Sequence, residues 1–373
     1  MWRTHLGASL LYVFVGGVTV GFSPLSLESG SFPAQRHLDS ASPTAPAETA
    51  SVPTQVEGLF SSDDLLEFVL EANWDELDDD RDQESEERPG QAVWTSPEGQ
   101  EFTIPIEIRT RGIFRLKKST CSFPPFRLDF PSEGTEGTVF EGQDKVKLVT
   151  HCRDRDSYEQ NVMEEYLAYR VYNTLTDVGF KVRPARITYV DSRGEDDPVT
   201  RMAFLLEDED AMAARLEGQI LEVAGAPASH FHQEQAGLMY IFQFMIGNTD
   251  WSMTRFHNVK VMRIGSDYFP IPYDFDFSGI VDAPYAGPNP MMAHLIDNVK
   301  QRLYWGACND AIDYQALFAQ YNDQRGAILA LPSSVPGLSE RNQRTAVSYL
   351  EQFYNVITND RRADRMIMDA CRR

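Results

Sequence analysis

Basic residues are scarce in this chain relative to acidic ones. Its 373 residues include 34 Lys and Arg against 56 Asp and Glu, for a formal net charge of −22. Proteins that bind nucleic acid need clustered Lys and Arg to displace counterions, so this balance argues against a nucleic-acid partner. A solvated acidic surface is the simplest interpretation. A local basic patch with a divalent metal still allows such a protein to hold a nucleotide.

Several common catalytic signatures are also missing. The chain has no Gly-x-Gly-x-x-Gly loop, no Walker A loop and no Gly-x-Ser-x-Gly motif. A conventional nucleotide loop and an esterase-like catalytic triad therefore have no support.

Cysteine is rare as well, with four residues and no Cys-x-x-Cys motif, so zinc or dithiol chemistry has little support. The four cysteines allow three disulfide pairings. We favour a Cys121–Cys152 pair because these residues flank one β-rich region, with free buried thiols as the alternative.

The N-terminal residues form an apolar run over 6–22 after the short cationic start MWRTH. This pattern is typical of an export signal, and the run is near the lower length limit for spanning a bilayer. Residues 1–22 are therefore predicted to be a signal peptide or an N-terminal membrane anchor. Residues 23–54, rich in Ser, Pro and Ala, predict a disordered tether. We expect an exported protein of the periplasm or cell envelope.

Alternating apolar residues predict an antiparallel sheet in the first half of the chain. Ile104, Ile106, Ile108 and Thr110 share one face of a strand. Further strand patterns and one helix follow; the strands cover residues 126–130, 145–150, 183–191 and 200–208, and the helix, capped by Asp156 or Ser157, covers 160–175. The acidic run 75–87 predicts an exposed loop.

Helical patterns dominate from residue 211 onward. They cover residues 211–219, 233–246, 293–306 and 339–373. The predicted class is α+β with two lobes: residues 55–210 as a β-rich N-lobe with one helix, and 211–373 as a mainly helical C-lobe.

The most informative stretch runs from GNTDWSMTRFHN to YFPIPYDFDFSG, two strand-like segments joined by a turn. It contains Asp250, Asn258, Asp274 and Asp276. Phosphoryl transfer needs a carboxylate to orient the acceptor hydroxyl, and an amide oxygen with a second carboxylate to hold the metal. On an alternating strand Asp274 and Asp276 share one face, which is unfavourable without a cation. Asp250 alone also suits a turn or a helix cap.

The chain resembles the CotH-like family of atypical protein kinases over roughly residues 102–305. The resemblance rests on RTRGIFRLKKS with PFRLDF, on KVKLVTHCRDRDSYEQNVMEEYLAYRVYN, on RPARITYVD with AFLLEDED, and on GNTDWS, FHNVKV and PYDFDFSG. It implies a two-lobed protein-kinase-like fold, with transfer of phosphate from ATP and Mg²⁺ or Mn²⁺ to a protein or other hydroxyl acceptor. It also implies Asp250 as the catalytic aspartate, Asn258 and Asp274 as metal ligands, and Asp276 as a further carboxylate of the metal site.

The same resemblance suggests how the nucleotide phosphates are held. Lys147, or Lys145 on the same strand face, corresponds to the phosphate-contacting lysine, with Glu165 or the adjacent Glu164 as its ion-pair partner. The turn Arg111-Gly112 would cover the phosphates, because glycine lets backbone approach a ligand closely.

Two other interpretations remain open. One is a catalytically inactive binding or structural protein of the cell envelope on a kinase-like scaffold, since fold does not establish activity. The other keeps the site but transfers AMP instead of phosphate.

Overall fold

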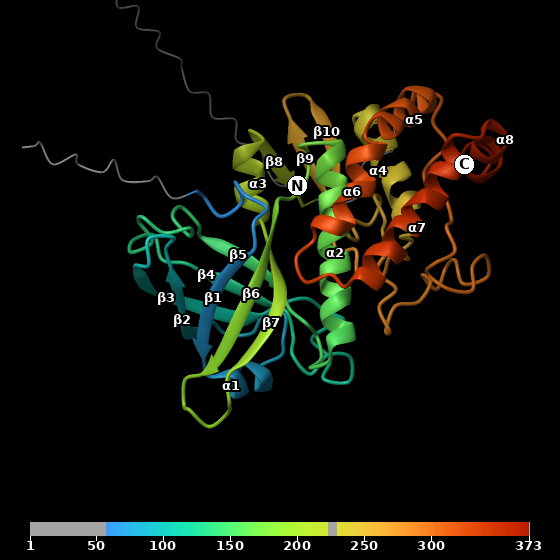
Figure 1. The fold of residues 1–373 in the computed structure, drawn as a ribbon. Helices are drawn as coiled ribbons and strands as arrows, with labels where there is room; N and C mark the ends of the chain where they lie inside the picture. The colour runs from blue at the N-terminus through green and yellow to red at the C-terminus, as the bar shows by residue number, and fades with distance from the viewer. Residues whose placement is uncertain (1–56, 223–229, 373) are drawn as a thin grey trace, which may run out of the picture. The chain divides into compact units, whose positions relative to one another are not determined.

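A seven-stranded β-barrel forms the first half of the part of the chain that this computed structural model describes, residues 57–222 and 230–372 (Figure 1). All these residues belong to one compact unit, 54–373. The predicted signal peptide or anchor and the tether lie outside the described residues. The barrel strands are β1 (Leu66–Ala72), β2 (Arg88–Thr95), β3 (Glu101–Thr110), β4 (Phe126–Asp129), β5 (Lys145–Val149), β6 (Val182–Asp191) and β7 (Val199–Leu206).

The barrel interior confirms the predicted strand faces. Ile104, Ile106, Ile108 and Thr110 are all buried, and the three Ile side chains belong to the same apolar cluster as Leu128. The strands follow the order β1-β2-β3-β4-β5-β7-β6, and β1 closes the ring by pairing parallel to β6. All other barrel pairs are antiparallel.

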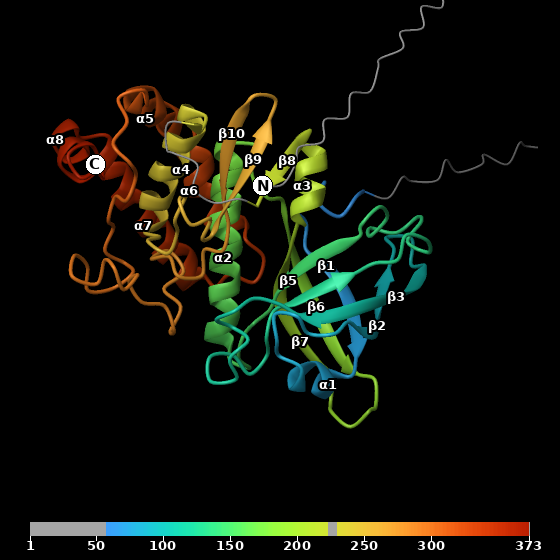
Figure 2. The same ribbon diagram turned by 180° about the vertical axis from the view of Figure 1, so that it is seen from behind.

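Helix α2 (Asp156–Leu175) lies between the barrel and the later helices (Figures 1 and 2). It contacts β6 and β7 on one side and α6 on the other, so its side chains are buried around most of its circumference. Its N-cap is Arg155, without a side-chain capping bond, so the predicted cap at Asp156 or Ser157 is wrong.

The second half combines helices with a small antiparallel sheet of order β10-β9-β8. Its elements are α3 (Glu209–Arg215), β8 (Gly218–Leu221), α4 (Gln233–Ile246), β9 (Val259–Ile264), β10 (Asp267–Pro272), α5 (Tyr314–Asp323), α6 (Arg325–Ser334), α7 (Glu340–Ile357), α8 (Asp360–Ala363) and a π-helical turn, Asp364–Met368. The predicted bounds of α4 are confirmed.

Two local predictions are wrong. Residues 293–306 form turns and irregular chain rather than a helix. Their apolar residues Ile296, Val299 and Tyr304 are buried individually, so tertiary packing overrides the helical periodicity. The acidic run expected as a loop begins inside a short helix, α1 (Trp74–Asp79), which is capped by the side chain of Asn73.

The predicted two-lobed protein-kinase-like fold, with an antiparallel N-lobe and a helical C-lobe, is also wrong. A closed barrel with one parallel strand pair replaces the predicted antiparallel sheet, and three strands form a second sheet within the predicted helical half. Strand periodicity reports which face is buried, but it does not report which strands pair. The closing partner of β1 is β6, which is distant in the sequence, so no local pattern indicated closure.

Two disulfides cross-link the described residues. Cys121–Cys152 confirms the favoured pairing, and Cys308–Cys371 ties the C-terminal segment to the chain that precedes α5. None of the helices in residues 57–222 and 230–372 combines the length and the apolarity needed to cross a bilayer.

Candidate active site

Seven of the eight predicted site residues line a single cavity of about 370 Å³. The cavity lies where the loop after β3, helix α2 and the loops flanking β9 and β10 meet. The predicted residues that line it are Arg111, Gly112, Glu165, Asp250, Asn258, Asp274 and Asp276. Lys147 is not among them.

Asp250 and Asn258 are brought together by a short loop between α4 and β9. Helix α4 is capped at its C-terminus by Gly247, which has a left-handed backbone, and Asn248 Oδ1 accepts a hydrogen bond from the Asp250 amide at 2.8 Å. Ser252 and His257 then exchange backbone hydrogen bonds, which returns the chain to Asp250. Asn258 Nδ2 donates to the backbone oxygen of Asp250 at 2.8 Å and to its Oδ2 at 3.2 Å.

This hydrogen bonding orients both side chains. Asn258 donates through its amide nitrogen, and no hydrogen bond from the residues that the structure describes reaches its Oδ1. His257 Nε2 lies 3.1 Å from Asp250 Oδ1, and this hydrogen bond raises the pKa of His257. Asp250 therefore sits between an amide donor and an imidazole, with a quarter of its side chain exposed.

Asp274 and Asp276 follow β10 and do not lie on it, so their predicted strand position is wrong. Asp274 has a left-handed backbone, with φ 63°, and its amide donates to Tyr169 Oη at 2.8 Å. Phe275 is fully buried against the rings of Tyr169 and Phe242, at 4.5 and 5.3 Å between ring centroids. This anchor fixes the segment, and the two carboxyl groups on either side of it line the cavity.

Several non-glycine residues of the segment from Asp250 to Asp276 have a left-handed backbone. Phe256, Asn258 and Asp274 all have φ between 51° and 63°, a region that side chains with a Cβ rarely adopt. Such conformations persist only where surrounding structure imposes them, and they cluster at functional sites.

The cavity contains more buried carboxyl groups than buried cations. Burial and the charge of Asp274 raise the pKa of Glu165 to about 7, although Arg115 opposes the shift. Burial, Asp274 and Glu165 raise the pKa of Asp276 well above its usual range. The Asp274 and Asp276 side chains are within hydrogen-bonding reach of each other, and Tyr285 Oη donates to Asp276 Oδ2 at 3.0 Å. A bound cation would relieve this repulsion.

Arg115, which sequence reasoning missed, holds the position expected of Lys147. Its guanidinium is buried, lies 3.7 Å from Glu165 and donates to the backbone oxygen of Thr150. Lys147 Nζ instead lies 3.8 Å from Asp208 and 4.0 Å from Glu209. The predicted Lys147–Glu165 ion pair is therefore wrong. Arg115 stands within the motif RTRGIFRLKKS, but its spacing gave no sign that it reaches α2.

Lys145, the alternative to Lys147, pairs with Asp144 at 3.7 Å and does not line the cavity. Arg111 lines the cavity with no carboxylate of the described residues within 4 Å of it. Gly112 beside it has φ 98°, a conformation that favours glycine.

The donor set suits a hard divalent cation. Within the described ranges no three His, Cys, Asp or Glu side chains group as metal ligands. Two carboxylates and one amide oxygen, from Asp274, Asp276 and Asn258, are nevertheless the oxygen ligands that Mg²⁺ and Mn²⁺ prefer, and Mg²⁺ usually keeps several waters. These three residues therefore fit the metal implied by the sequence.

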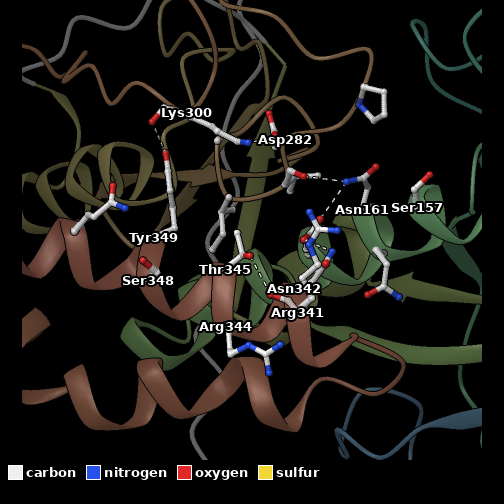
Figure 3. A pocket seen from close by; sticks show the side chains of 17 residues that line it. Ser157, Asn161, Asp282, Lys300, Arg341, Asn342, Arg344, Thr345, Ser348 and Tyr349 are labelled. Carbon is white, nitrogen blue, oxygen red and sulfur yellow. Dashed lines mark hydrogen bonds and ion pairs between the residues drawn. The ribbon is translucent and has the colours of Figure 1, made fainter.

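A second cavity, of about 750 Å³, lies between α2, α7 and the segment after Asp276 (Figure 3). Glu164 faces this side, where it accepts hydrogen bonds from Asn161 and from Asn342 of α7. Lys300 pairs with Asp282 at its rim. The two neighbouring glutamates of α2 thus serve different cavities, which selects Glu165 for the candidate active site.

The two ends of the segment 247–279, which contains Asp250, Asn258, Asp274 and Asp276, meet beside Tyr349 of α7. The Gly279 amide donates to the Gly247 backbone oxygen at 3.2 Å. A Cβ at Gly247 would lie 2.1 Å from Tyr349 Oη, and one at Gly279 would lie 2.3 Å from it and 2.4 Å from the Val299 oxygen. Only glycine at these two positions allows this close approach.

No protein-family model matches the chain, and no curated protein matches it. The resemblance to the CotH-like family therefore stays a prediction.

Proposed function

We propose that this chain is a metal-dependent phosphotransferase, which uses ATP with Mg²⁺ or Mn²⁺ to phosphorylate a hydroxyl group of a protein or small molecule. The convergence of Asp250, Asn258, Asp274 and Asp276 on one cavity carries this proposal. The order of these residues in the sequence suggested phosphoryl transfer. This reaction requires the acceptor-orienting carboxylate and the metal ligands to lie in one cavity.

In this proposal Asn258 Oδ1 and the carboxylates of Asp274 and Asp276 hold the metal, which neutralises charge on the phosphates. Arg111 and Arg115 supply further positive charge beside the same cavity. The Gly112 backbone allows the loop after β3 to approach the phosphates closely.

Asp250 orients the acceptor hydroxyl and accepts its proton as the oxygen attacks the γ-phosphorus. The new O–P bond forms as the bond between the γ-phosphorus and the bridging oxygen breaks, and ADP leaves. Hydrogen bonds from Asn258 and His257 hold the Asp250 carboxylate in place for this role.

A second candidate function is a cell-envelope binding protein that retains a metal site without catalysis. The engagement of Lys147 by Asp208 and Glu209 favours it, because no lysine is left for the phosphates at the position that the sequence indicated. Transfer of AMP at the same site is the alternative reaction.

We also propose an exported location, in the periplasm or cell envelope. The two disulfides support it, because disulfides form and persist mainly in oxidising compartments. Mass spectrometry of the protein isolated from its cells under thiol-blocking conditions tests this, and four reduced cysteines would contradict it.

The decisive experiment for the function compares Asp250→Asn with Asp274→Asn in the full chain. Nucleotide binding is followed calorimetrically with Mg²⁺ or Mn²⁺, and transfer is followed by the release of ADP or pyrophosphate with a panel of hydroxyl acceptors. We expect Asp250→Asn to bind metal–ATP normally but to lose about 10²–10⁴-fold in rate, the usual contribution of a general base. Asp274→Asn should lose binding.

The outcomes separate the candidates. Full transfer by a folded Asp250→Asn protein would refute the proposed role of Asp250. Metal-dependent nucleotide binding without release of ADP or pyrophosphate from ATP, whichever acceptor is added, would favour the binding protein. Release of pyrophosphate in place of ADP would identify AMP transfer.

A further inference from the structure

Two exposed apolar side chains, Ile113 and Phe114, line the candidate active site from the loop after β3. Ile113 is 68% exposed and Phe114 is 38% exposed, and both line the cavity of about 370 Å³ that contains Asp250. No other large apolar side chain of the described residues is as exposed as Ile113. Because apolar groups gain free energy when they leave water, neighbouring exposed ones beside a cavity indicate a binding surface.

Aromatic contacts hold Phe114 in place. Its ring lies 5.1 Å from the ring of Phe277, edge to face, and 5.8 Å from the ring of Tyr285, measured between centroids. Phe277 is half-buried and also lines the cavity. A side chain that is already fixed loses little conformational freedom when it binds a ligand, which favours binding. We call Ile113, Phe114 and Phe277 the apolar rim.

Phe256 brings a further aromatic side chain to the same cavity from another segment. It is half-buried and has a left-handed backbone, with φ 52°, which aromatic residues rarely adopt. Phe256 precedes His257, whose imidazole contacts Asp250, and Phe277 directly follows Asp276. Aromatic residues are therefore the sequence neighbours of residues that the proposed function assigns to the acceptor and to the metal.

The apolar rim does not suit the phosphates of ATP. Phosphates are charged and need the metal and cations such as Arg111 and Arg115, whereas aromatic and aliphatic side chains favour apolar groups. The cavity also has buried apolar lining from Val149 and Leu206, which are 4% and 3% exposed and can enclose a nucleobase. The exposed rim is thus left for the acceptor, which must reach Asp250 from solvent.

The size of the cavity favours a peptide as the acceptor. Pockets for drug-sized ligands measure about 300–1,000 Å³, so metal–ATP alone occupies most of the roughly 370 Å³ present here. The acceptor therefore extends over the apolar rim, outside the cavity. A peptide can place a hydroxyl group at Asp250 while a neighbouring side chain covers Ile113 and Phe114, and a small alcohol cannot.

We propose that the acceptor is a peptide segment with a large apolar side chain next to its Ser or Thr, and that the apolar rim selects it. This inference rests on the proposed phosphotransferase function and makes its substrate class more specific. The apolar side chain of the acceptor packs on Ile113 and Phe114, while Asp250 accepts the proton of the hydroxyl group. The hydroxyl oxygen bonds to the γ-phosphorus, and ADP leaves.

Matched peptides test this proposal with the full chain. Each short acetylated peptide contains one Ser in an Ala–Gly background, with Ala, Leu, Phe or Glu before or after it. Transfer is followed by ADP release, and peptide binding is measured separately by calorimetry with Mg²⁺ and ADP present. We expect the Leu and Phe peptides to bind about tenfold more tightly than the Ala peptide, since about 60 Å² of apolar surface leaves water. Their kcat/KM should rise by a similar factor.

Variants of the apolar rim localise this preference. The double variant Ile113→Ser, Phe114→Ser should lower the ratio between the Phe and Ala peptides from about tenfold to near one. Both side chains are exposed, so the protein should still fold, which its melting temperature checks. If the double variant melts early, Ile113→Ser alone leaves the ring contacts intact and should still lower the ratio. The matched control is Met368→Ser, which should keep the ratio, because Met368 is also 38% exposed and does not line the cavity.

The two readouts separate this inference from the proposed function. Equal binding and equal transfer for the Ala, Leu and Phe peptides would overturn the inference and leave the phosphotransferase function intact. A preference for the Glu peptide alone would assign selection to charge and also overturn it, as would an unchanged ratio in the folded double variant. A binding preference without ADP release would support the apolar rim as a peptide site and favour the binding protein over the phosphotransferase.

Discussion

Neutralising Asp276 should stabilise the protein without metal and abolish its response to metal. Asp276 is 5% exposed and lies within hydrogen-bonding reach of Asp274, with Glu165 nearby. Two charged carboxylates about 4 Å apart repel by about 4 kcal/mol at an effective dielectric constant near 20, and protonation of one relieves part of this. Asp276→Asn should therefore raise the free energy of unfolding by about 1–3 kcal/mol. The hydrogen bond from Tyr285 survives, because an amide oxygen also accepts it.

Metal should stabilise the wild type but have little effect on the Asp276→Asn variant. A divalent cation at about 100 times its dissociation constant stabilises the wild type by about 2.7 kcal/mol through mass action. Without Asp276 the site loses one of its two carboxylate ligands, so the stabilisation should largely disappear. The variant should thus be more stable than the wild type in EDTA and equal or less stable in Mg²⁺ or Mn²⁺.

Circular-dichroism melts of both proteins in EDTA and in about 10 mM MgCl₂ or MnCl₂ measure this crossing. A free-energy change of 1 kcal/mol shifts the melting temperature by about 1.5 °C in a folded unit that spans residues 54–373. Asp267→Asn, at the exposed start of β10, is the matched control and should follow the wild type. A variant that melts below the wild type in EDTA and responds equally to metal would refute the reasoning.

Three further perturbations test other parts of the structure. Burial raises the pKa of Glu164 from 4.5 to about 7, so the folded state holds more protons than the unfolded state and stability falls as pH rises through that window. Glu164→Gln should reduce this fall by about 3 kcal/mol in urea titrations between pH 4 and 8; an unchanged pH profile would contradict the burial of its charge. Gly279→Ala should cost about 2 kcal/mol or more in the same assay, and adding Tyr349→Phe should restore only part, because a backbone oxygen still blocks the Cβ. Full rescue would show that the hydroxyl alone sets the limit. Replacing Cys121 and Cys152 by Ser opens a loop closed by residues 31 apart and should cost about 3–4 kcal/mol, whereas an unchanged urea midpoint would rule out the pair.

Much of the candidate site was predictable because its geometry is local. Asp250 and Asn258 are joined by a short loop whose backbone bonds form between near neighbours, such as Ser252 and His257. The Asp274–Asp276 segment follows the adjacent hairpin directly. The order of Asp250, Asn258 and Asp274 in the sequence was therefore enough to predict that their side chains line the same cavity.

The error at Lys147 has a different cause. Strand alternation correctly put Lys145 and Lys147 on the same face of β5, but it did not indicate the ion-pair partner of Lys147. The β5–β7 pairing brings Lys147 beside Asp208 and Glu209, which follow the end of β7. Arg115 reaches Glu165 from an irregular loop, for which no periodicity exists to read.

Glu164 and Glu165 show the same limit within a single helix. The sequence pattern predicted the helix, and neighbouring residues on it must point in different directions. Only the packing of α2 between the barrel and α7 decides that Glu165 joins the candidate active site while Glu164 contacts Asn342.

The sequence by itself determined the features that depend on near neighbours: the buried face of β3, the bounds of α4, and the acid and amide order from Asp250 to Asp276. The tertiary structure alone decided the closure of the barrel by β1 and β6 and the identity of the cation beside Glu165. These features join segments far apart along the chain, and such contacts depend on the packing of the whole unit, which periodicity and local propensity do not encode.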